Sequence, residues 1–586
     1  MLLDVHGHPP PDRSRLPGLL AALERWDSRL LLSDLGARDT GWVHAPEVRH
    51  WQEGNEQCAE LVRQHPDRLL GYCYVNPAHG REALAEMERR LLGEPETFGA
   101  LKLWVAVRCS DPCLDPLMEL CAAHDVPVLQ HTWIKAGPQG PGSGNLAGES
   151  TPEDLLALAR RHPRVRFFGG HIGGDWEWGV AALKQVDNVW LDVAGGDASG
   201  GYMEAALAGV GAGRIVYGTD VTGRSIPSQL AKILAVDLSE TDREKILWQN
   251  AAHVLGKRLP PAWREAFGRG GAAEGAQAPE GRRGRGTAPR LPPPPPGGYL
   301  DANAFLGEWP GRRLNGSPPP VREALVPARL AQMDALGIRR AAVSLLEGTF
   351  LKDSGVANAE LRTLTALAPQ RLFPVYTLNP LFPAWNEHLQ RCLQDYGLAP
   401  GTGALRLSPA YHGYPLDHPA LEACLDRLQA LGLPVVLTWQ LEDTRMQGTA
   451  MQVPDLDPAA VAALATRRPG LRLVLTGAVG NQILATARHL PPEARVWFDL
   501  SRVQGPVDGV LHLCREVGPG RLLFGTNVPL HVAASPVLEV ADAVAAGLPE
   551  GDAGALRYAN AGVALGLTPL QDERHPAPPA GLSSER

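Results

Sequence analysis

The chain has 586 residues, of which 44% are apolar and 20% charged, and its formal net charge is −8. This length exceeds one ordinary domain, while the composition is typical of a globular protein. The acidic balance argues against nucleic-acid binding, and no apolar run reaches transmembrane length. Eight scattered cysteines without a preceding secretory signal favour a reduced, cytoplasmic setting.

Apolar, strand-like runs alternate with helical patterns over residues 1–260. The helical patterns include Pro152–Arg161, with Thr151 as a plausible N-cap, and Ser225–Ala235. Several runs are apolar on both faces, as in a parallel sheet covered by helices. Eight such units in about 260 residues predict a closed (β/α)8 barrel. The expected strands are Leu2–Val5, Leu30–Leu35, Leu69–Val75, Ala100–Val105, Val126–Gln130, Val165–Phe168, Val189–Val193 and Ile215–Tyr217.

Residues 261–297 are expected to link two domains. They contain a Gly/Ala/Arg tract and the proline run Pro292–Pro296, which predicts a stiff, extended spacer. The Pro-rich tail, 567–586, is expected to be disordered.

After the linker, residues 298–566 repeat the first half. Val496-Trp-Phe-Asp-Leu matches Val189-Trp-Leu-Asp-Val, and Leu523-Phe-Gly-Thr-Asn-Val matches Val216-Tyr-Gly-Thr-Asp-Val. Most matching pairs are separated by a similar distance along the chain. The sequence therefore predicts two tandem α/β barrels of the TIM type, derived from one ancestral unit.

Polar residues close several predicted strands of the first half. His6 and His8 lie on one face of the first strand, and His131, His171 and Asp220 follow later strands. All strands of a parallel barrel run the same way, so these side chains should meet at one mouth, where barrel active sites lie.

Five segments in this half resemble the amidohydrolase superfamily, and in particular the branch that includes aminocarboxymuconate-semialdehyde decarboxylase and several lactonases and hydrolases. The resemblance implies that His6, His8, His131 and Asp220 hold one divalent metal, usually zinc, and that His171 stands beside the reacting groups. The segments are Asp4-Val-His-Gly-His, Leu129-Gln-His-Thr-Trp, Gly169-Gly-His-Ile-Gly-Gly, Gly218-Thr-Asp-Val and Ile246-Leu-Trp-Gln-Asn-Ala-Ala.

The chemistry of these side chains agrees with that implication. Imidazoles and a carboxylate suit zinc, which lowers the pKa of bound water to ~7. Asp220 is expected both to bind metal and to accept a proton, and His171 to act as a proton or hydrogen-bond donor.

Four further residues are candidates for substrate binding. Lys102 would bind substrate charge or close its strand; a carbamate ligand is the less favoured alternative, because Arg406 holds the same place in the second half. Arg224 is expected to clamp a substrate carboxylate, and Trp104 and Trp176 to wall the pocket.

The second half lacks the ligand set. Its corresponding residues are Asn303, Phe305, Thr438, Gly477 and Asn527. We therefore expect a metal-free second barrel that docks on the first as an internal pseudo-dimer partner. The alternative is a small-molecule site near Arg406, Tyr411 and His412, and further homo-oligomers remain open.

Three functions follow from these observations. The first is a metal-dependent hydrolase of a small-molecule amide, ester or lactone. The second is a metal-dependent, non-oxidative decarboxylase of an unsaturated or aromatic acid. The third is a two-barrel binding or scaffold protein without turnover, against which the intact ligand set argues.

Overall fold

The computed structural model describes residues 1–36, 42–270, 289–312, 314, 322–448 and 451–567. Its first half contains eight parallel strands in sequential order, each neighbouring the next. All eight strands that the sequence predicts are present, with small shifts at their ends. They are β1 Leu2–Gly7, β2 Ser28–Leu32, β3 Leu69–Tyr74, β4 Phe98–Leu103, β5 Val128–His131, β6 Phe167–Gly170, β7 Val189–Asp192 and β8 Ile215–Val216.

Hydrogen bonds between the first and last strands bring the sheet to near closure. Val5 N donates to Tyr217 O at 3.1 Å, and Asp220 N donates to His6 O at 2.7 Å. The buried Asp4 carboxylate adds to this seam by accepting from Thr219 N and Thr219 Oγ1 at 3.0 and 2.5 Å. The seam thus places the ends of β1 and β8 side by side.

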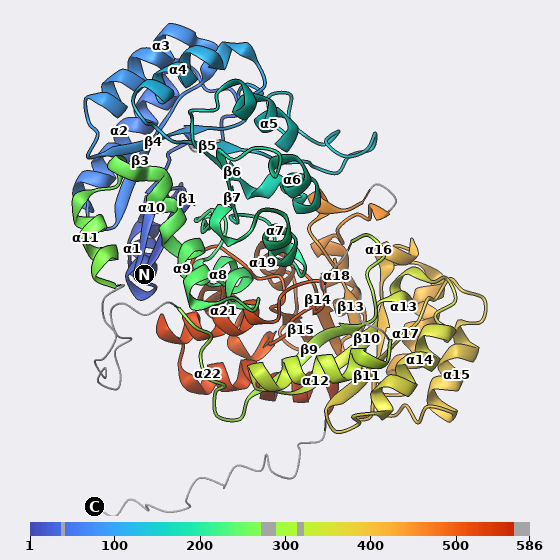
Figure 1. Ribbon diagram of the computed structural model, residues 1–586. Coiled ribbons are helices and arrows are strands. Elements are labelled where there is room, and N and C mark those ends of the chain that lie inside the picture. Colours follow the sequence, from blue (N-terminus) through green and yellow to red (C-terminus); the bar gives the residue numbers. More distant parts are fainter. Residues whose placement is uncertain (37–41, 271–288, 313, 315–321, 449–450, 568–586) are drawn as a thin grey trace, which may run out of the picture.

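Helices follow each strand and cover the outside of this barrel (Figure 1). Thr151 caps α5 with a capping box, as the sequence predicts, and Ser225 caps α8. The helices between and after the strands are α1 Leu16–Arg25, α2 Val48–Gln64, α3 Gly80–Met87, α4 Asp115–Ala123, α5 Pro152–Arg161, α6 Trp176–Leu183, α7 Tyr202–Val210, α8 Ile226–Leu234, α9 Glu240–Glu244, α10 Asn250–Leu255 and α11 Pro261–Gly270.

Helix α11 corrects the expected start of the linker. Trp263 and Phe267, four residues apart on one helical face, are buried in the cluster that includes Leu3 and Val5. Trp248 stacks on Phe267 with ring centroids 5.1 Å apart. The first barrel therefore extends to residue 270. Most of the remaining expected linker, 271–288, and nearly all of the expected tail, 568–586, lie outside the described residues.

The second half repeats the same architecture with eight more parallel strands in sequential order. These strands are β9 Tyr299–Leu306, β10 Ile338–Leu345, β11 Leu372–Thr377, β12 Ala404–Leu407, β13 Val435–Thr438, β14 Leu473–Thr476, β15 Val496–Asp499 and β16 Leu522–Leu523. The helices are α12 Leu325–Leu336, α13 Glu347–Phe350, α14 Gly355–Ala366, α15 Trp385–Gln394, α16 Pro409–His412, α17 Pro419–Ala430, α18 Pro458–Arg467, α19 Gly480–Ala487, α20 Gly509–Val517, α21 Ala534–Ala545, α22 Glu550–Gly554 and α23 Asn560–Leu565.

Contacts join the two barrels where α8 packs against α21 (Figure 1). The Asp542 carboxylate accepts from Arg25 Nε at 3.0 Å and from Trp26 Nε1 at 2.7 Å. Arg502 Nη2 lies 3.0 Å from Asp197 Oδ2 in a second, buried pair. Polar and apolar contacts both contribute, since Ala534 and Leu538 of α21 belong to the first barrel's core.

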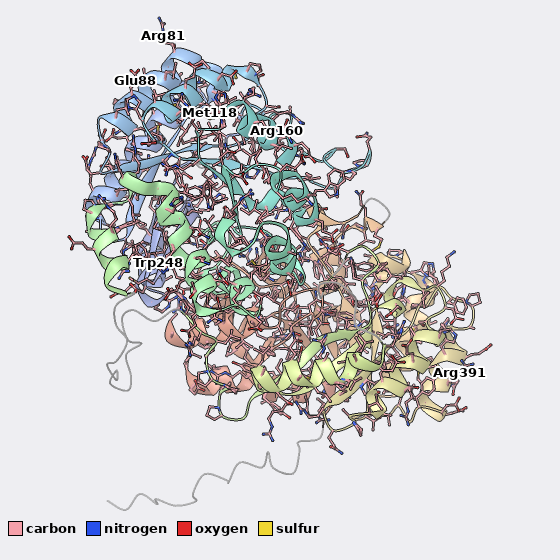
Figure 2. All side chains as sticks on the ribbon, in the orientation of Figure 1. Arg81, Glu88, Met118, Arg160, Trp248 and Arg391 are labelled. Atoms are coloured by element: carbon pink, nitrogen blue, oxygen red, sulfur yellow. The ribbon has the colours of Figure 1, made fainter. Side chains whose placement is uncertain are left out.

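The outer surface carries long charged side chains, such as Arg81 and Arg391, that project from the helices (Figure 2). Within the described part of the chain, no helix combines the length and apolar character that crossing a membrane requires.

Candidate active site

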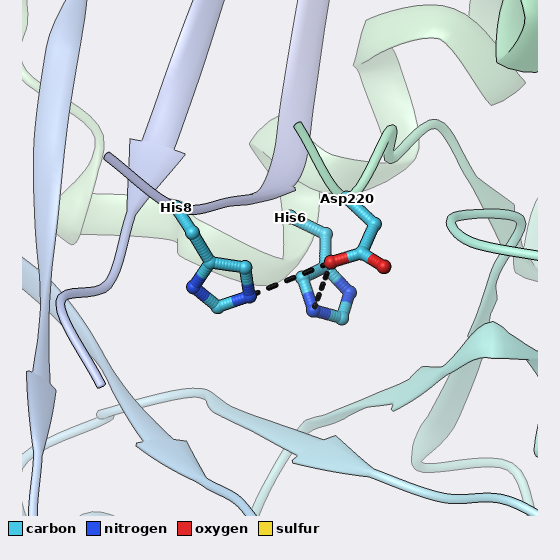
Figure 3. A group of neighbouring side chains, drawn as sticks. All are labelled: His6, His8 and Asp220. Carbon is cyan, nitrogen blue, oxygen red and sulfur yellow. Dashed lines mark ion pairs between the residues drawn. The ribbon is translucent and has the colours of Figure 1, made fainter. Parts of the chain in front are cut away.

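Three side chains converge at the mouth of the first barrel, from the ends of β1 and β8. His6 Nε2 and His8 Nε2 lie 3.9 and 3.5 Å from Asp220 Oδ1 (Figure 3). The ligand atoms of all three lie within 4.8 Å of one another. Gly7 between the histidines lets the backbone approach β2 closely, because a Cβ there would lie 2.5 Å from Leu30 Cδ1 and would force that side chain to move.

Hydrogen bonds at the back of each imidazole determine which nitrogen faces the cluster. His6 Nδ1 donates to Asp192 Oδ2 at 2.6 Å, and His8 Nδ1 donates to Ser33 O at 2.8 Å. Each Nε2 therefore presents a lone pair toward the Asp220 carboxylate. Two lone pairs and an anionic oxygen repel one another unless a cation lies between them, so this donor set fits a divalent metal.

Burial keeps the imidazoles of this cluster neutral. It lowers the pKa of His6 well below its usual value and that of His8 to about 3, with the Lys102 charge acting in the same direction. Burial also raises the pKa of Asp220 to about 6, while Lys102 lowers it. Neutral imidazoles near pH 7 are the form that binds metal.

Asp220 and His171 both hold left-handed backbone conformations, with φ of 64° and 63°. Non-glycine residues rarely adopt such angles, and strain of this kind concentrates at functional sites. The conformation at Asp220 turns its carboxylate toward the two histidines at the end of β8.

His131 and His171 form a second pair beside the cluster. His171 Nε2 lies 3.1 Å from His131 Nδ1, and His171 Nδ1 donates to Ala194 O at 3.0 Å. His131 Nε2 contacts Glu149 Oε1 at 3.1 Å, and Lys135 pairs with the other oxygen of Glu149 at 2.7 Å. His131 is therefore outside the group whose ligand atoms lie within 4.8 Å of one another.

Lys102 lies at the floor of the site, at the end of β4. Its Nζ is 2.8 Å from His6 Nε2, and burial lowers its pKa to about 8. This ammonium and a metal would compete for the same imidazole lone pair. The contact places Lys102 beside the cluster, as expected for a residue that meets substrate charge.

A cavity of about 260 Å³ opens over these residues. Trp104 lines this cavity, together with Trp42, His44 and Trp133, which were not among the predicted wall residues. Its other lining residues are His6, His8, Leu35, Lys102, Val105, His131, Lys135, Leu146, Glu149, His171, Asp220, Thr222, Gly223 and Arg445.

Two predicted substrate-binding residues lie elsewhere. Trp176 is buried, with its ring 5.3 Å from that of Tyr202, and does not line the cavity, because it begins α6 and points into the packing beneath. Arg224 lines a neighbouring cleft between the barrels, since the chain turns outward after Asp220.

Comparison with known proteins decides the family. A family model described as amidohydrolase matches residues 3–257 and, a second time, residues 283–567. The chain belongs to the amidohydrolase family. The double match confirms the tandem duplication that the repeats predict. A search of curated proteins finds no match.

Several solved structures each match less than half of this chain and nearly all of their own. 5-Carboxyvanillate decarboxylase from Sphingomonas paucimobilis is 15% identical, covering 43% of this chain and 98% of its own, with a TM-score of 0.35. 2,6-Dihydroxybenzoate decarboxylase from Rhizobium is 17% identical with the same coverages and TM-score. A dihydroxybenzoic acid decarboxylase from Polaromonas sp. JS666, solved with manganese and 2-nitroresorcinol, is 19% identical, covering 44% and 98%, with a TM-score of 0.36.

The second amidohydrolase barrel has a guanidinium where the first has its lysine. Arg406 Nη2 donates to Asn303 Oδ1 at 3.0 Å, and Nη1 donates to Thr438 Oγ1 at 2.9 Å. Its Nε donates to Ser344 Oγ at 2.8 Å, and its charge lies 4.3 Å over the Phe305 ring. Arg406 is fully buried, so these partners rather than a ligand engage it.

Asp192, which accepts a hydrogen bond from His6, is a further residue of this site that sequence reasoning missed. It closes β7 as the other polar residues close their strands, and Asp499 repeats it in the second half. The repeated aspartate could have identified Asp192 as a site residue from the sequence.

Proposed function

We propose that the first barrel is a metal-dependent hydrolase of a small-molecule amide, ester or lactone. The observation that carries this proposal is the convergence of two neutral imidazole nitrogens and one carboxylate below an open cavity. His6, His8 and Asp220 would hold the metal, with His131 as a further ligand if its ring turns from His171. A divalent metal there, zinc by preference, would polarise a substrate carbonyl and acidify bound water.

The protein's own residues would carry the proton transfers. Asp220 contacts the histidines through Oδ1, so its other oxygen is available to accept a proton. His171 faces the cavity from the end of β6 and is held through Nδ1, while its Nε2 lies 3.1 Å from His131 Nδ1. If His131 turns away to bind the metal, Nε2 of His171 would be free to exchange a proton with substrate. Asp192 would orient His6 through the 2.6 Å hydrogen bond.

Elemental analysis of the purified full chain, combined with hydrolysis assays on a panel of aryl esters, lactones and amides, tests the proposal. We expect about one divalent metal per chain and turnover that a chelator abolishes. Metal without hydrolysis would reject the hydrolase. A chain without stoichiometric metal would support the scaffold reading instead.

Decarboxylation of an unsaturated or aromatic acid is the second candidate. Lys102 favours it, because an ammonium 2.8 Å from His6 Nε2 would hold a carboxylate directly at the cluster. The tryptophan walls, Trp42 and Trp104, suit a planar body. Release of CO2 from aromatic acids, in place of hydrolysis, would select this candidate.

We propose that the second barrel acts as a built-in partner that stabilises the first. The support is the set of contacts between them, which includes the buried pair of Asp197 with Arg502 and the double use of Asp542 by Arg25 and Trp26. Its own site has Arg406 in place of a metal ligand set.

A further inference from the structure

One residue of the second barrel lines the catalytic cavity of the first. Arg445 lies in the turn Thr444–Met446 that follows β13, and it borders the same cavity as His8, His171 and Asp220. Nothing in its position along the chain suggests a role in a site formed by the first half. Its place follows from the way the two barrels meet.

Both barrels hold Arg445 in position. Its guanidinium lies 4.3 Å over the ring of Trp133, from the first barrel, and its Nη2 pairs with Asp443 Oδ2 at 2.7 Å. Its backbone oxygen accepts from Ala136 N at 2.8 Å. Stacking on one face and a carboxylate on one edge orient a guanidinium and leave its other edge for a ligand. Within the described part of the chain, no hydrogen bond uses Nη1 of Arg445.

A cleft of about 350 Å³ between the barrels adjoins the cavity, since Gly223 and Arg445 line both spaces. In that cleft Arg502 is engaged by Asp197, at 3.0 Å. Arg224 is less engaged, since its nitrogens lie 3.8 Å from Asp197 and 3.7 Å from Asp443, beyond hydrogen-bond distance. Arg224 and Arg445 therefore keep donors for a ligand at the junction.

We propose that the second barrel supplies Arg445 as a specificity-determining residue, and that the preferred substrate carries a carboxylate at the end remote from the reacting bond. The planar walls Trp104 and Trp133 fit an unsaturated or aromatic body between the two ends. A guanidinium binds a carboxylate in two parallel hydrogen bonds, which gives directional as well as charge selectivity. This inference rests on the proposed function, because it takes the metal cluster as the reacting end.

Binding of probe acids to the zinc-loaded full chain tests the inference by calorimetry. Benzoate offers one carboxylate, while isophthalate and terephthalate offer a second at two spacings. We expect the wild-type chain to bind at least one dicarboxylate roughly tenfold or more tighter than benzoate, as one charged bidentate pair provides. Arg445→Gln should remove this preference and leave benzoate affinity and zinc content unchanged. Arg445→Lys should keep part of it.

Arg25→Gln is the matched control. Arg25 also pairs across the interface, with Asp508 at 2.6 Å and Asp542 at 3.0 Å, but lines neither the cavity nor the cleft. It should lower the melting temperature at least as much as Arg445→Gln, yet keep the dicarboxylate preference. A wild-type chain without that preference, or an Arg445→Gln variant that keeps it, overturns the inference. Failure of the wild-type chain to bind zinc would instead overturn the proposed function.

Discussion

Arg406 donates a 3.0 Å hydrogen bond to Asn303, the residue that stands where the first barrel has His6. In the first barrel Lys102 lies 2.8 Å from His6 at the same place. Both barrels therefore hold a cation at the centre of the mouth, but among the residues that the structure describes, lone pairs and a carboxylate converge to accept a metal in the first barrel alone. In the second barrel, the Arg406 guanidinium supplies the hydrogen bonds that Asn303, Ser344 and Thr438 accept.

Replacement of Arg406 should destabilise the second barrel without giving it a metal. Arg406→Met leaves the buried Asn303, Ser344 and Thr438 short of a partner, at about 1–3 kcal/mol per unsatisfied group. Because Ser344 Oγ still donates to Val375 O, two of these groups lose their partner, and we expect a loss of about 2–6 kcal/mol in urea unfolding, partly recovered in Arg406→Lys. Unchanged unfolding, or a second metal per chain, would contradict this account.

Replacement of Asp220 and replacement of His171 should impair the protein in different ways. Asp220→Asn removes the charge from the cluster and should cost both metal and turnover. His171→Ala should keep the metal and lower turnover roughly 10²–10⁴-fold, the range for a general acid or base. Metal content and kcat measured on the same preparations distinguish the two variants. Loss of the metal from His171→Ala would show that His171 is a ligand.

Asp192→Asn should weaken metal binding without removing a ligand. The 2.6 Å hydrogen bond from His6 Nδ1 fixes the ring and raises its basicity, and loss of such a partner typically costs about 10–100-fold in affinity. Asp499→Asn is the matched control, because Asp499 ends β15 of the second barrel, where we expect no metal, and its replacement should leave metal affinity unchanged. Competition with a chromogenic chelator measures both, and equal effects would reject the role of Asp192.

Glu539 should make the barrel interface sensitive to pH. It is buried in α21 beside Ser225 of the first barrel, and burial, with Asp542 and Asp508 adding, raises its pKa well above 4.5. The folded state therefore holds the proton more tightly than the unfolded state, whose pKa stays near 4.5. The contribution of Glu539 to stability is therefore fully present below pH 4.5 and falls as pH rises toward the folded pKa, by up to about 1.4 kcal/mol per pH unit.

Glu539→Gln cannot ionise, so it should lose less stability than the wild-type chain between pH 5 and pH 8. Thermal unfolding at the two pH values measures the difference. Equal pH dependence in the two proteins would show that Glu539 is ionised without cost in the folded chain.

Cleavage at Pro292–Pro296 should reveal what the docked barrel contributes. We expect the first half alone to keep its metal but to melt at lower temperature or self-associate, because Arg25 and Trp26 lose Asp542. The second half added in trans should restore the melting temperature, and Asp542→Ala in that half should weaken the rescue. A first half that is monomeric and equally stable alone would refute the partner role.

The fold was predictable because its signals are local. Each strand is a short apolar run. His6 and His8 are two residues apart in the sequence, which places them on one face of a strand. The end of the first barrel was missed although Trp263 and Phe267 carry the spacing of a helical face, since the Gly/Pro-rich composition nearby outweighed it. Arg445 could not be predicted, because its place depends on how two separately folded barrels meet.

The two barrels belong to one chain, which connects α11 to β9, and this has a consequence for the symmetry between them. In a homodimer every residue appears twice, so a change that improves one mouth is imposed on the other. One continuous chain removes that constraint, and Lys102 and Arg406 can occupy equivalent places with different chemistry. The halves also stay paired at any dilution, so the specific activity of such an enzyme should not fall as its own concentration falls.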